Sequence, residues 1–174
     1  MNFYALDVET ANPDQSSICQ IGVAIFENGR LVDTWSSYIN PNDSFHWKFI
    51  DIHGITPEMV ARKPTFPTVY PVLRGMFENQ IVVSHSSFDR VAFHRAYDRF
   101  WLEPFDVRWL DSVKVARKAF GSGCLEGGYN LANLANYLDI DFRHHDALED
   151  AVTCGKVVVE ACRRLGIGVE AFFE

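Results

Sequence analysis

Hydrophobic positions gather in three short segments at the start of the chain, separated by polar turns. Residues 3–8, 18–26 and 31–39 are rich in β-branched and aromatic side chains, a composition that favours strands. The Asn-Gly pair within residues 27–30 is typical of a tight hairpin turn. The pattern therefore predicts three antiparallel strands.

Helical spacing dominates the rest of the chain. Residues 40–71 are broken by prolines and predict a loop, with a short helix after Pro57. In the last predicted helix, apolar residues recur every three or four positions from Leu148 to Leu165, which indicates one buried face. The remaining elements predicted are strands over 81–84 and 107–112 and helices over 68–79, 87–100 and 131–138, with a further helix that follows the strand over 107–112 and ends at about 119. In the helix over 87–100 the predicted apolar stripe is Phe88, Val91, Ala92, Ala96 and Phe100.

Strands followed by alternating helices and strands indicate an α/β domain with a mixed five-stranded sheet. The length of 174 residues suits one domain spanning 1–174. The formal net charge of -7 argues against a simple basic surface for a polyanion. No pair of cysteines has zinc-site spacing, and neither a basic leader nor a membrane-length apolar run is present. We expect reduced core cysteines and a cytoplasmic location.

Two acids near the start of the chain form the first candidate site. In "YALDVET" (residues 4–10), Asp7 and Glu9 project from the same face of a strand because side chains alternate. Two adjacent like charges favour a divalent cation between them. The alternative is that Glu9 lies beyond the strand end and is solvated.

A second group of polar residues precedes the last helix. In "RHHDALEDAV" (residues 143–152), Asp146 and Glu149 have the spacing of a capping box. Asp150 lies one turn into the helix, and His145 stands just before the cap. An acid and an imidazole so placed can hold a metal and remove a proton from water. The alternatives are a helix-dipole charge for Asp150 and a solvated loop histidine for His145.

Asp89 is a third candidate, because it opens a helix directly after the strand over 81–84. Ser86 and Asp89 also fit a capping box, which would make this acid a local stabiliser. Asp111, at the end of the strand over 107–112, is read as a helix cap or a group behind the ligands.

The ordered set of D-x-E, "SHSSFD" and H-x-A-x-x-D resembles the DEDDh branch of the 3′→5′ exonucleases, over about residues 3–160. This DnaQ-like family includes the proofreading epsilon subunit of bacterial DNA polymerase III and ribonuclease T. The resemblance implies an RNase H-like fold and two divalent ions, Mg²⁺ or Mn²⁺. It implies Asp7, Glu9, Asp89 and Asp150 as metal ligands and His145 as general base, with His144 a bystander. Asp7 would bridge both ions, and Asp89 would support the second.

The resemblance also implies contacts with the terminal nucleotide. By similarity, the substrate-binding residues are Thr10, Ala11, His53, Gly54, Ile55, His85 and Phe88. From composition alone, Phe45, Trp47 and Phe49 are candidates for base stacking or for the core. Arg90, Arg95 and Arg99 either follow phosphates or are ordinary exposed helix charges.

The implied activity is hydrolysis of phosphodiester bonds at single-stranded 3′ ends, releasing nucleoside 5′-monophosphates. DNA is the expected substrate, and proofreading or repair beside a polymerase is the expected setting, with no membrane. An RNA-trimming exoribonuclease of the same family is one alternative. A non-catalytic module that binds 3′ ends or a polymerase is another.

Overall fold

The structure is a computed structural model, and it describes residues 1–121, 127–141 and 146–173. Five strands and seven α-helices follow one another in this part of the chain, ahead of a short 3₁₀ helix, Val169–Phe172. The strands are β1 (Phe3–Thr10), β2 (Ile18–Glu27), β3 (Arg30–Tyr38), β4 (Ile81–Ser84) and β5 (Arg108–Asp111). The helices are α1 (Trp47–His53), α2 (Pro57–Val60), α3 (Phe66–Phe77), α4 (Phe88–Phe100), α5 (Ser112–Phe120), α6 (Leu131–Tyr137) and α7 (Ala147–Leu165).

The strands form one mixed sheet in the order β3-β2-β1-β4-β5. The pairs β1/β2 and β2/β3 are antiparallel, whereas β4 runs parallel to β1 and β5 parallel to β4. Asn28 and Gly29 join β2 to β3 with φ values of 52° and 73°, the left-handed conformation of a tight hairpin turn. The predicted mixed five-stranded sheet, with its antiparallel strands first, is confirmed.

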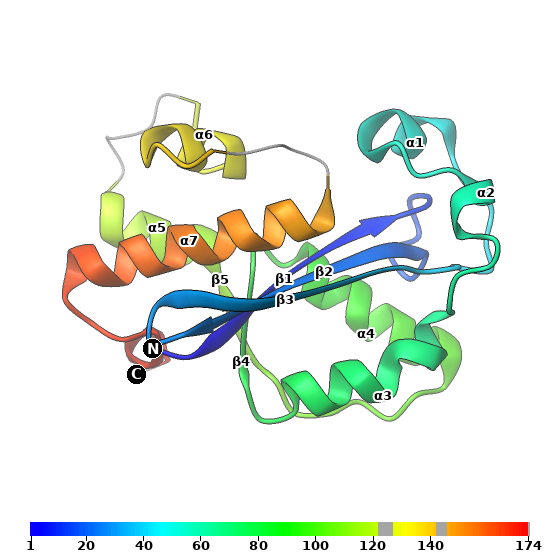
Figure 1. The fold of residues 1–174 in the computed structure, drawn as a ribbon, viewed down its shortest axis with the longest axis horizontal. Helices are drawn as coiled ribbons and strands as arrows, with labels where there is room; N and C mark the ends of the chain where they lie inside the picture. The colour runs from blue at the N-terminus through cyan, green and yellow to red at the C-terminus, as the bar shows by residue number, and fades with distance from the viewer. Residues whose placement is uncertain (122–126, 142–145, 174) are drawn as a thin grey trace.

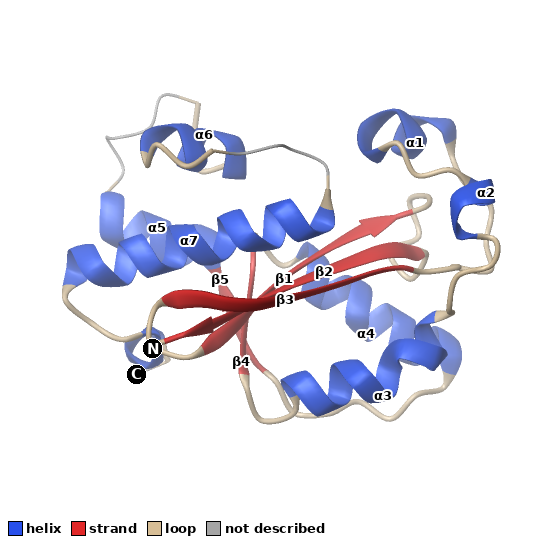
Figure 2. Ribbon diagram, in the orientation of Figure 1, coloured by secondary structure: helices blue, strands red, loops and turns tan. Residues whose placement is uncertain are grey.

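Helices cover both faces of this sheet (Figures 1 and 2). One core layer packs α5, α6 and α7 against Phe3 and Ala5 of β1. The other packs α3 and α4 against Leu6 and Val8. Because successive side chains of β1 enter opposite layers, this central strand presents each face to a different set of helices.

The structure differs from the sequence prediction in two places. A helix, α1, lies within the segment predicted as loop, and none of its residues is buried. In α4 the buried residues include Ala92, Phe93, Ala96 and Tyr97, so the predicted stripe is correct only in part. Phe88, predicted on the buried side, is 38% exposed.

Cys19, Cys154 and Cys162 are buried free thiols, as predicted, and burial raises the pKa of each. Cys124 lies outside the described residues. Within the described ranges, no helix is both long and apolar enough to cross a bilayer.

Candidate metal centre

The central strand carries the first two acids of the site. Asp7 and Glu9 share the face of β1 that also carries Phe3 and Ala5, and both are half-buried. The strand continues to Thr10, so Glu9 lies within it, contrary to the solvated alternative. A register irregularity follows at Glu9/Thr10, the kind of local distortion that re-aims side chains near functional sites.

The start of α7 is fixed by its cap and by β2. The carboxylate of Asp146 accepts hydrogen bonds from the backbone N–H groups of Leu148 (3.0 Å) and Glu149 (3.2 Å). This confirms Asp146 as the N-cap. Gln20 on β2 donates from Nε2 to Asp146 (3.0 Å), and its Oε1 accepts from the N–H of Ala147 (3.4 Å). Sequence reasoning missed Gln20, which ties the helix to the sheet at this point.

A glycine allows α7 to lie directly on β2. A Cβ atom at Gly22 would fall 2.3 Å from the backbone of Ala147, far inside contact distance. Gly22 is the register partner of Asp7. The first turn of α7 is therefore held against the strand beside Asp7, and Asp150 on that turn is brought to the same place.

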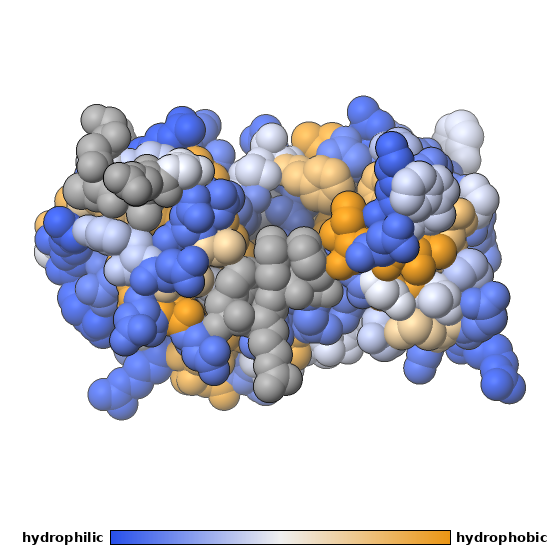
Figure 3. Space-filling model, turned by 90° about the horizontal axis from the view of Figure 1, so that it is seen from above, coloured by the Kyte–Doolittle hydropathy of each residue, from blue (hydrophilic) through white to orange (hydrophobic). Residues whose placement is uncertain are grey.

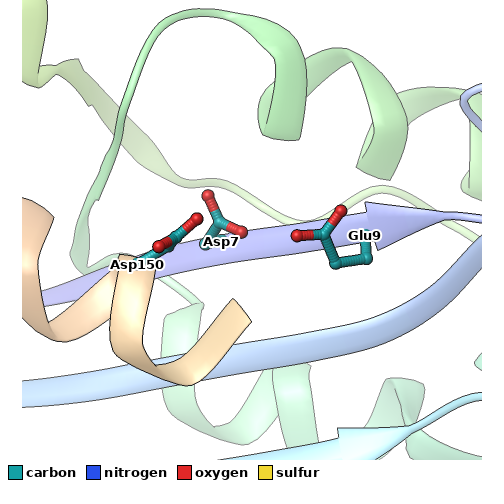
Figure 4. Close-up of side chains that lie close together, drawn as sticks. All are labelled: Asp7, Glu9 and Asp150. Atoms are coloured by element: carbon teal, nitrogen blue, oxygen red, sulfur yellow. The ribbon is translucent and has the colours of Figure 1, made fainter. Parts of the chain in front are cut away.

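Three carboxylates meet as a result. Ligand oxygens of Asp7, Glu9 and Asp150 all lie within 4.8 Å of one another. Figure 4 shows the two β1 acids and the α7 acid with their carboxylates gathered on one side of the strand. Residues from the first strand and from α7 thus converge at one place.

Asp89 approaches the cluster from the first turn of α4, which follows the short connection from β4. Ser86 in this connection has a φ of 90°, an unusual value for a residue with a side chain. Asp89 is 3% exposed, and its Oδ1 accepts the backbone N–H of Val8 on β1 at 3.0 Å. The capping-box alternative is wrong, because Ser87 rather than Ser86 is the N-cap of α4, and the carboxylate of Asp89 reaches the central strand.

Burial and mutual repulsion disfavour the charged forms of three of these acids, Asp7, Glu9 and Asp89. Burial first, and then the charges of Asp89, Asp150 and Glu9, raise the pKa of Asp7 well above its usual range. Burial followed by Asp150 and Asp89 raises the pKa of Glu9 to about 7. Burial likewise raises the pKa of Asp89 to about 7, although the bond from Val8 opposes the shift.

Among the described residues, no lysine or arginine acts on the pKa of Asp7, Glu9 or Asp89. Carboxylates that are buried this close together repel one another, and the arrangement is unfavourable unless a cation binds between them. Carboxylate oxygens are the ligands that hard divalent ions prefer. The donor set therefore fits Mg²⁺ or Mn²⁺. The expected general base, His145, and its neighbour His144 lie outside the described residues.

The residues expected at the terminal nucleotide lie beyond the cluster along β1. The N–H of Ile55 donates to Nδ1 of His53 (3.0 Å), so Nε2 carries the ring proton and donates to the carbonyl of Thr10 (3.1 Å). Gly54 closes α1 with a φ of 73°. Ile55 is 2% exposed and packs with Ala11 in a small core, so its side chain anchors this turn. The backbone of Ala11 bonds to Ser17 and to His46.

The two other expected substrate contacts flank Asp89. His85 is half-buried, and its Nδ1 lies 2.8 Å from the hydroxyl of Ser112. Phe88 precedes Asp89 with its ring partly exposed. Asp111 caps α5 through a bond from the N–H of Val113 (2.8 Å), so the cap interpretation is confirmed.

Aromatic side chains on α1 also face solvent. Trp47 is 62% exposed, while Phe45 and Phe49 are half-buried. Seen from above in Figure 3, hydrophobic side chains gather on the half of the molecule that carries α1 and α2. Ile52 (51% exposed) and Met59 (41%) belong to these two helices. The core interpretation of Trp47 is therefore wrong.

Comparisons with known proteins agree on one family. The exonuclease family profile, of the ribonuclease T type, matches residues 4–158. The chain is 29% identical to the PolC-type DNA polymerase III of Thermotoga petrophila over 176 residues, covering 95% of this chain and 12% of the polymerase. It is 30% identical to the 3′-5′ exonuclease DinG of Bacillus subtilis over 174 residues, covering 94% and 18% of the two chains.

Solved structures show the same fold. Exonuclease X in complex with 5′ overhanging duplex DNA superposes with a TM-score of 0.75 at 22% identity, covering 97% of this chain and 95% of that one. The nuclease domain of 3′hExo, a DEDDh family member bound to rAMP, gives a TM-score of 0.76 at 19% identity, covering 93% and 92%.

The chain belongs to the exonuclease family that the ribonuclease T profile defines, and the DEDDh family member 3′hExo shares its fold. The resemblance drawn from the motifs is thereby confirmed. The chain spans only 12% and 18% of the length of the two curated relatives described above.

Proposed function

We propose that the chain hydrolyses phosphodiester bonds at single-stranded 3′ ends of DNA and releases nucleoside 5′-monophosphates, using two divalent metal ions. The observation that carries this proposal is the meeting of Asp7, Glu9 and Asp150 within 4.8 Å, with Asp89 bonded to the same strand. Family membership alone leaves open whether a chain retains its catalytic acids. Here Asp7, Glu9 and Asp150 share one location, and burial and neighbouring carboxylates raise the pKa of both Asp7 and Glu9.

Each acid has a separate task in this proposal. Asp7 would hold both ions, Glu9 and Asp150 would complete the site of one, and Asp89 would support the other. When bound, such ions activate water and stabilise charge on the phosphoryl oxygens. His145 accepts the proton of the attacking water, a task that suits an imidazole near neutral pH.

The substrate side of the site is assigned by position. Thr10, Ala11, His53 and Gly54 would receive the terminal sugar and base at the end of β1, with Ile55 fixing the turn. Phe88 would stack on a base and His85 would contact the backbone beside Asp89. Stacking tolerates any base sequence and requires an unpaired end, which supports a single-stranded substrate.

DNA is favoured by the similarity to PolC-type DNA polymerase III. That similarity also supports proofreading or repair beside a polymerase as the setting, with residues 1–174 as one exonuclease domain. RNA trimming is the second candidate, because the similar 3′hExo domain has rAMP bound.

The direct test uses 5′-labelled oligonucleotides with Mn²⁺ or with EDTA. We expect metal-dependent ladders that shorten from the 3′ end, fastest on single-stranded DNA, slower on a 3′-mismatched duplex and on RNA. Asp7→Asn and Asp150→Asn should each lower kcat on the order of 10²–10³-fold or more, as when a group that stabilises transition-state charge is removed.

Asp106→Asn provides the matched control, because this aspartate is exposed and far along the chain from the cluster. It should retain wild-type turnover. Binding of the oligonucleotide without shortening would instead identify a non-catalytic module, and faster cleavage of RNA would identify the exoribonuclease.

A further inference from the structure

A small recess lies at the carboxyl ends of β4 and β5. Its volume is about 210 Å³, and its walls come from the β4–α4 turn, the start of α5 and the last described residues of the chain. The lining includes Ser86, Ser87, Arg90, Asp111, Lys114 and Phe173.

Two cations face this recess without a hydrogen-bond or ion-pair partner in residues 1–121, 127–141 and 146–173. Arg90 and Lys114 are both exposed, and neither forms a hydrogen bond or ion pair with any described residue. The acid in the lining, Asp111, already accepts the N–H of Val113 at 2.8 Å. In a chain of net charge -7, two unpaired cations on one small concavity produce a local positive potential that attracts an anion.

The size of the recess limits what that anion can be. Pockets that enclose whole small molecules measure about 300–1,000 Å³, and this one is smaller at about 210 Å³. A single phosphate group with its ester oxygens suits such a space better than a complete free nucleotide. Arginine and lysine are also the side chains that most often contact phosphate.

The recess adjoins the metal centre on one side. Arg90 follows Asp89 on α4, and successive helix positions point in different directions, so one turn directs a carboxylate to β1 and a guanidinium to the recess. His85, which precedes Ser86, is joined at 2.8 Å to Ser112 near the start of α5. The residues proposed for the terminal nucleotide, Thr10 and His53, lie instead beyond the cluster at the end of β1.

We propose that this recess binds a phosphate of the substrate strand upstream of the scissile bond, through Arg90 and Lys114. The inference rests on the proposed function, because it requires a nucleic acid whose 3′ end occupies the metal centre. A strand that ends near Thr10 and crosses the four acids continues across β4, where these two cations offset its charge.

A phosphate of a complementary strand has the same chemistry. The substrate strand is favoured because two lining residues, Ser86 and Arg90, directly follow His85 and Asp89 in the chain, and the 3′ end itself must approach that pair. An experiment can distinguish a phosphate of the substrate strand from one of the complementary strand, because only the complementary strand requires a duplex.

The test compares the double variant Arg90→Ala/Lys114→Ala with Arg30→Ala/Lys156→Ala, which removes the same two charges at exposed positions elsewhere. Binding of a fluorescent single-stranded 12-mer is measured in EDTA, so the readout does not depend on catalysis. We expect the Kd to rise roughly 10-fold for the first variant, and the slope of log K against log salt to shrink by about 1.4.

Turnover supplies the second arm. The p-nitrophenyl ester of thymidine 5′-monophosphate has no upstream phosphate, so the recess variant should hydrolyse it at the wild-type rate while KM for the 12-mer rises. Equal salt slopes in the recess variant, the control and the wild type would overturn the proposal, as would loss of ester turnover in the recess variant alone.

A defect confined to duplexes with recessed ends would overturn the assignment to the substrate strand and indicate the complementary strand. If the wild-type protein cleaves neither substrate, the proposed function fails, while the binding arm still decides the role of the recess.

Discussion

The acid cluster and the α1–α2 segment differ sharply in how they are held. The acids stand on β1, α4 and α7, which are joined by the two large core layers and by hydrogen bonds spanning 81 and 126 residues of sequence. The α1–α2 segment packs through a small core of Ala11, Cys19, Ile55 and Val60, and α1 buries no residue. Packing in the first region fixes the positions of the acidic side chains, whereas the α1–α2 segment leaves most of its side chains exposed to solvent.

This difference suits what the proposed function requires of each region. Carboxylates that share a cation must be placed to within a fraction of an ångström, and only packed elements hold buried charges that repel one another. A surface that receives a flexible strand gains from exposed rings instead. Perturbing the first region should therefore change kcat, and perturbing the second should change KM.

The largest effect is expected at the contact between β2 and α7. Gly22→Ala places a methyl group 2.3 Å from the backbone of Ala147, so the start of α7 must move away from β1 and carry Asp150 with it. A misplacement near 1 Å costs about 10²-fold in rate. We expect kcat to fall by about that factor, measured in steady state with saturating Mn²⁺.

Gly155→Ala is the control for this prediction. Gly155 lies on the same helix as Asp150, just over one turn further along. The added methyl group would fall 2.1 Å from the ring of Phe26. Both variants should lose about 1–3 kcal/mol of stability through overpacking. An equal loss of kcat in both would mean that general destabilisation, rather than the position of Asp150, causes the defect.

A smaller effect is expected on the exposed side. Trp47→Ala removes a ring that is 62% exposed, and base stacking contributes about 1–3 kcal/mol. KM for single-stranded DNA should rise about 10-fold with kcat unchanged. Trp101→Ala is the matched control, because Trp101 is 94% exposed at the far end of α4. Unchanged KM for Trp47→Ala would remove α1 from the substrate path.

The smallest expected effect is on the stability of the metal-free protein. The pKa of Asp89 is raised to about 7, whereas an unfolded aspartate titrates near 3.9. Between pH 4 and pH 7 the Asp89 carboxyl keeps its proton in the folded state but has lost it in the unfolded state. The free energy of unfolding therefore falls as pH rises from about 4 to about 7. Above pH 7 the whole penalty is present.

Asp89→Asn removes that penalty and keeps an oxygen to accept the N–H of Val8. In EDTA at pH 8 its Tm should exceed the wild-type value by a few degrees, about 2–4 °C per kcal/mol, and the gain should vanish near pH 4. Asp106→Asn should show no such gain. A variant Tm below the wild type at pH 8 would contradict the account of unpaired charge in the site.

Much of this arrangement is encoded locally. The Asn-Gly hairpin, the apolar period of α7 and the cap at Asp146 each depend on a few adjacent residues, and the structure confirms them. The D-x-E pair was readable for the same reason. The α1 helix was not predicted, because it buries no side chain and therefore leaves no apolar period.

Other features depend on contacts between distant segments. Gln20 and Gly22 read as ordinary strand residues, and their importance appears only when α7 lies across them. The bond from Val8 to Asp89 likewise joins two motifs that sequence spacing alone does not pair. In α4, the neighbouring turn sets the helix rotation and exposes Phe88.

The bond between Gln20 and Asp146 joins residues 126 positions apart. A ribosome adds about 5–20 residues per second, so roughly 6–25 s separate the synthesis of these two partners. During that interval Asp7 and Glu9 have been made but Asp150 has not. The carboxylate cluster therefore cannot form until α7 has been synthesised and has docked on the sheet.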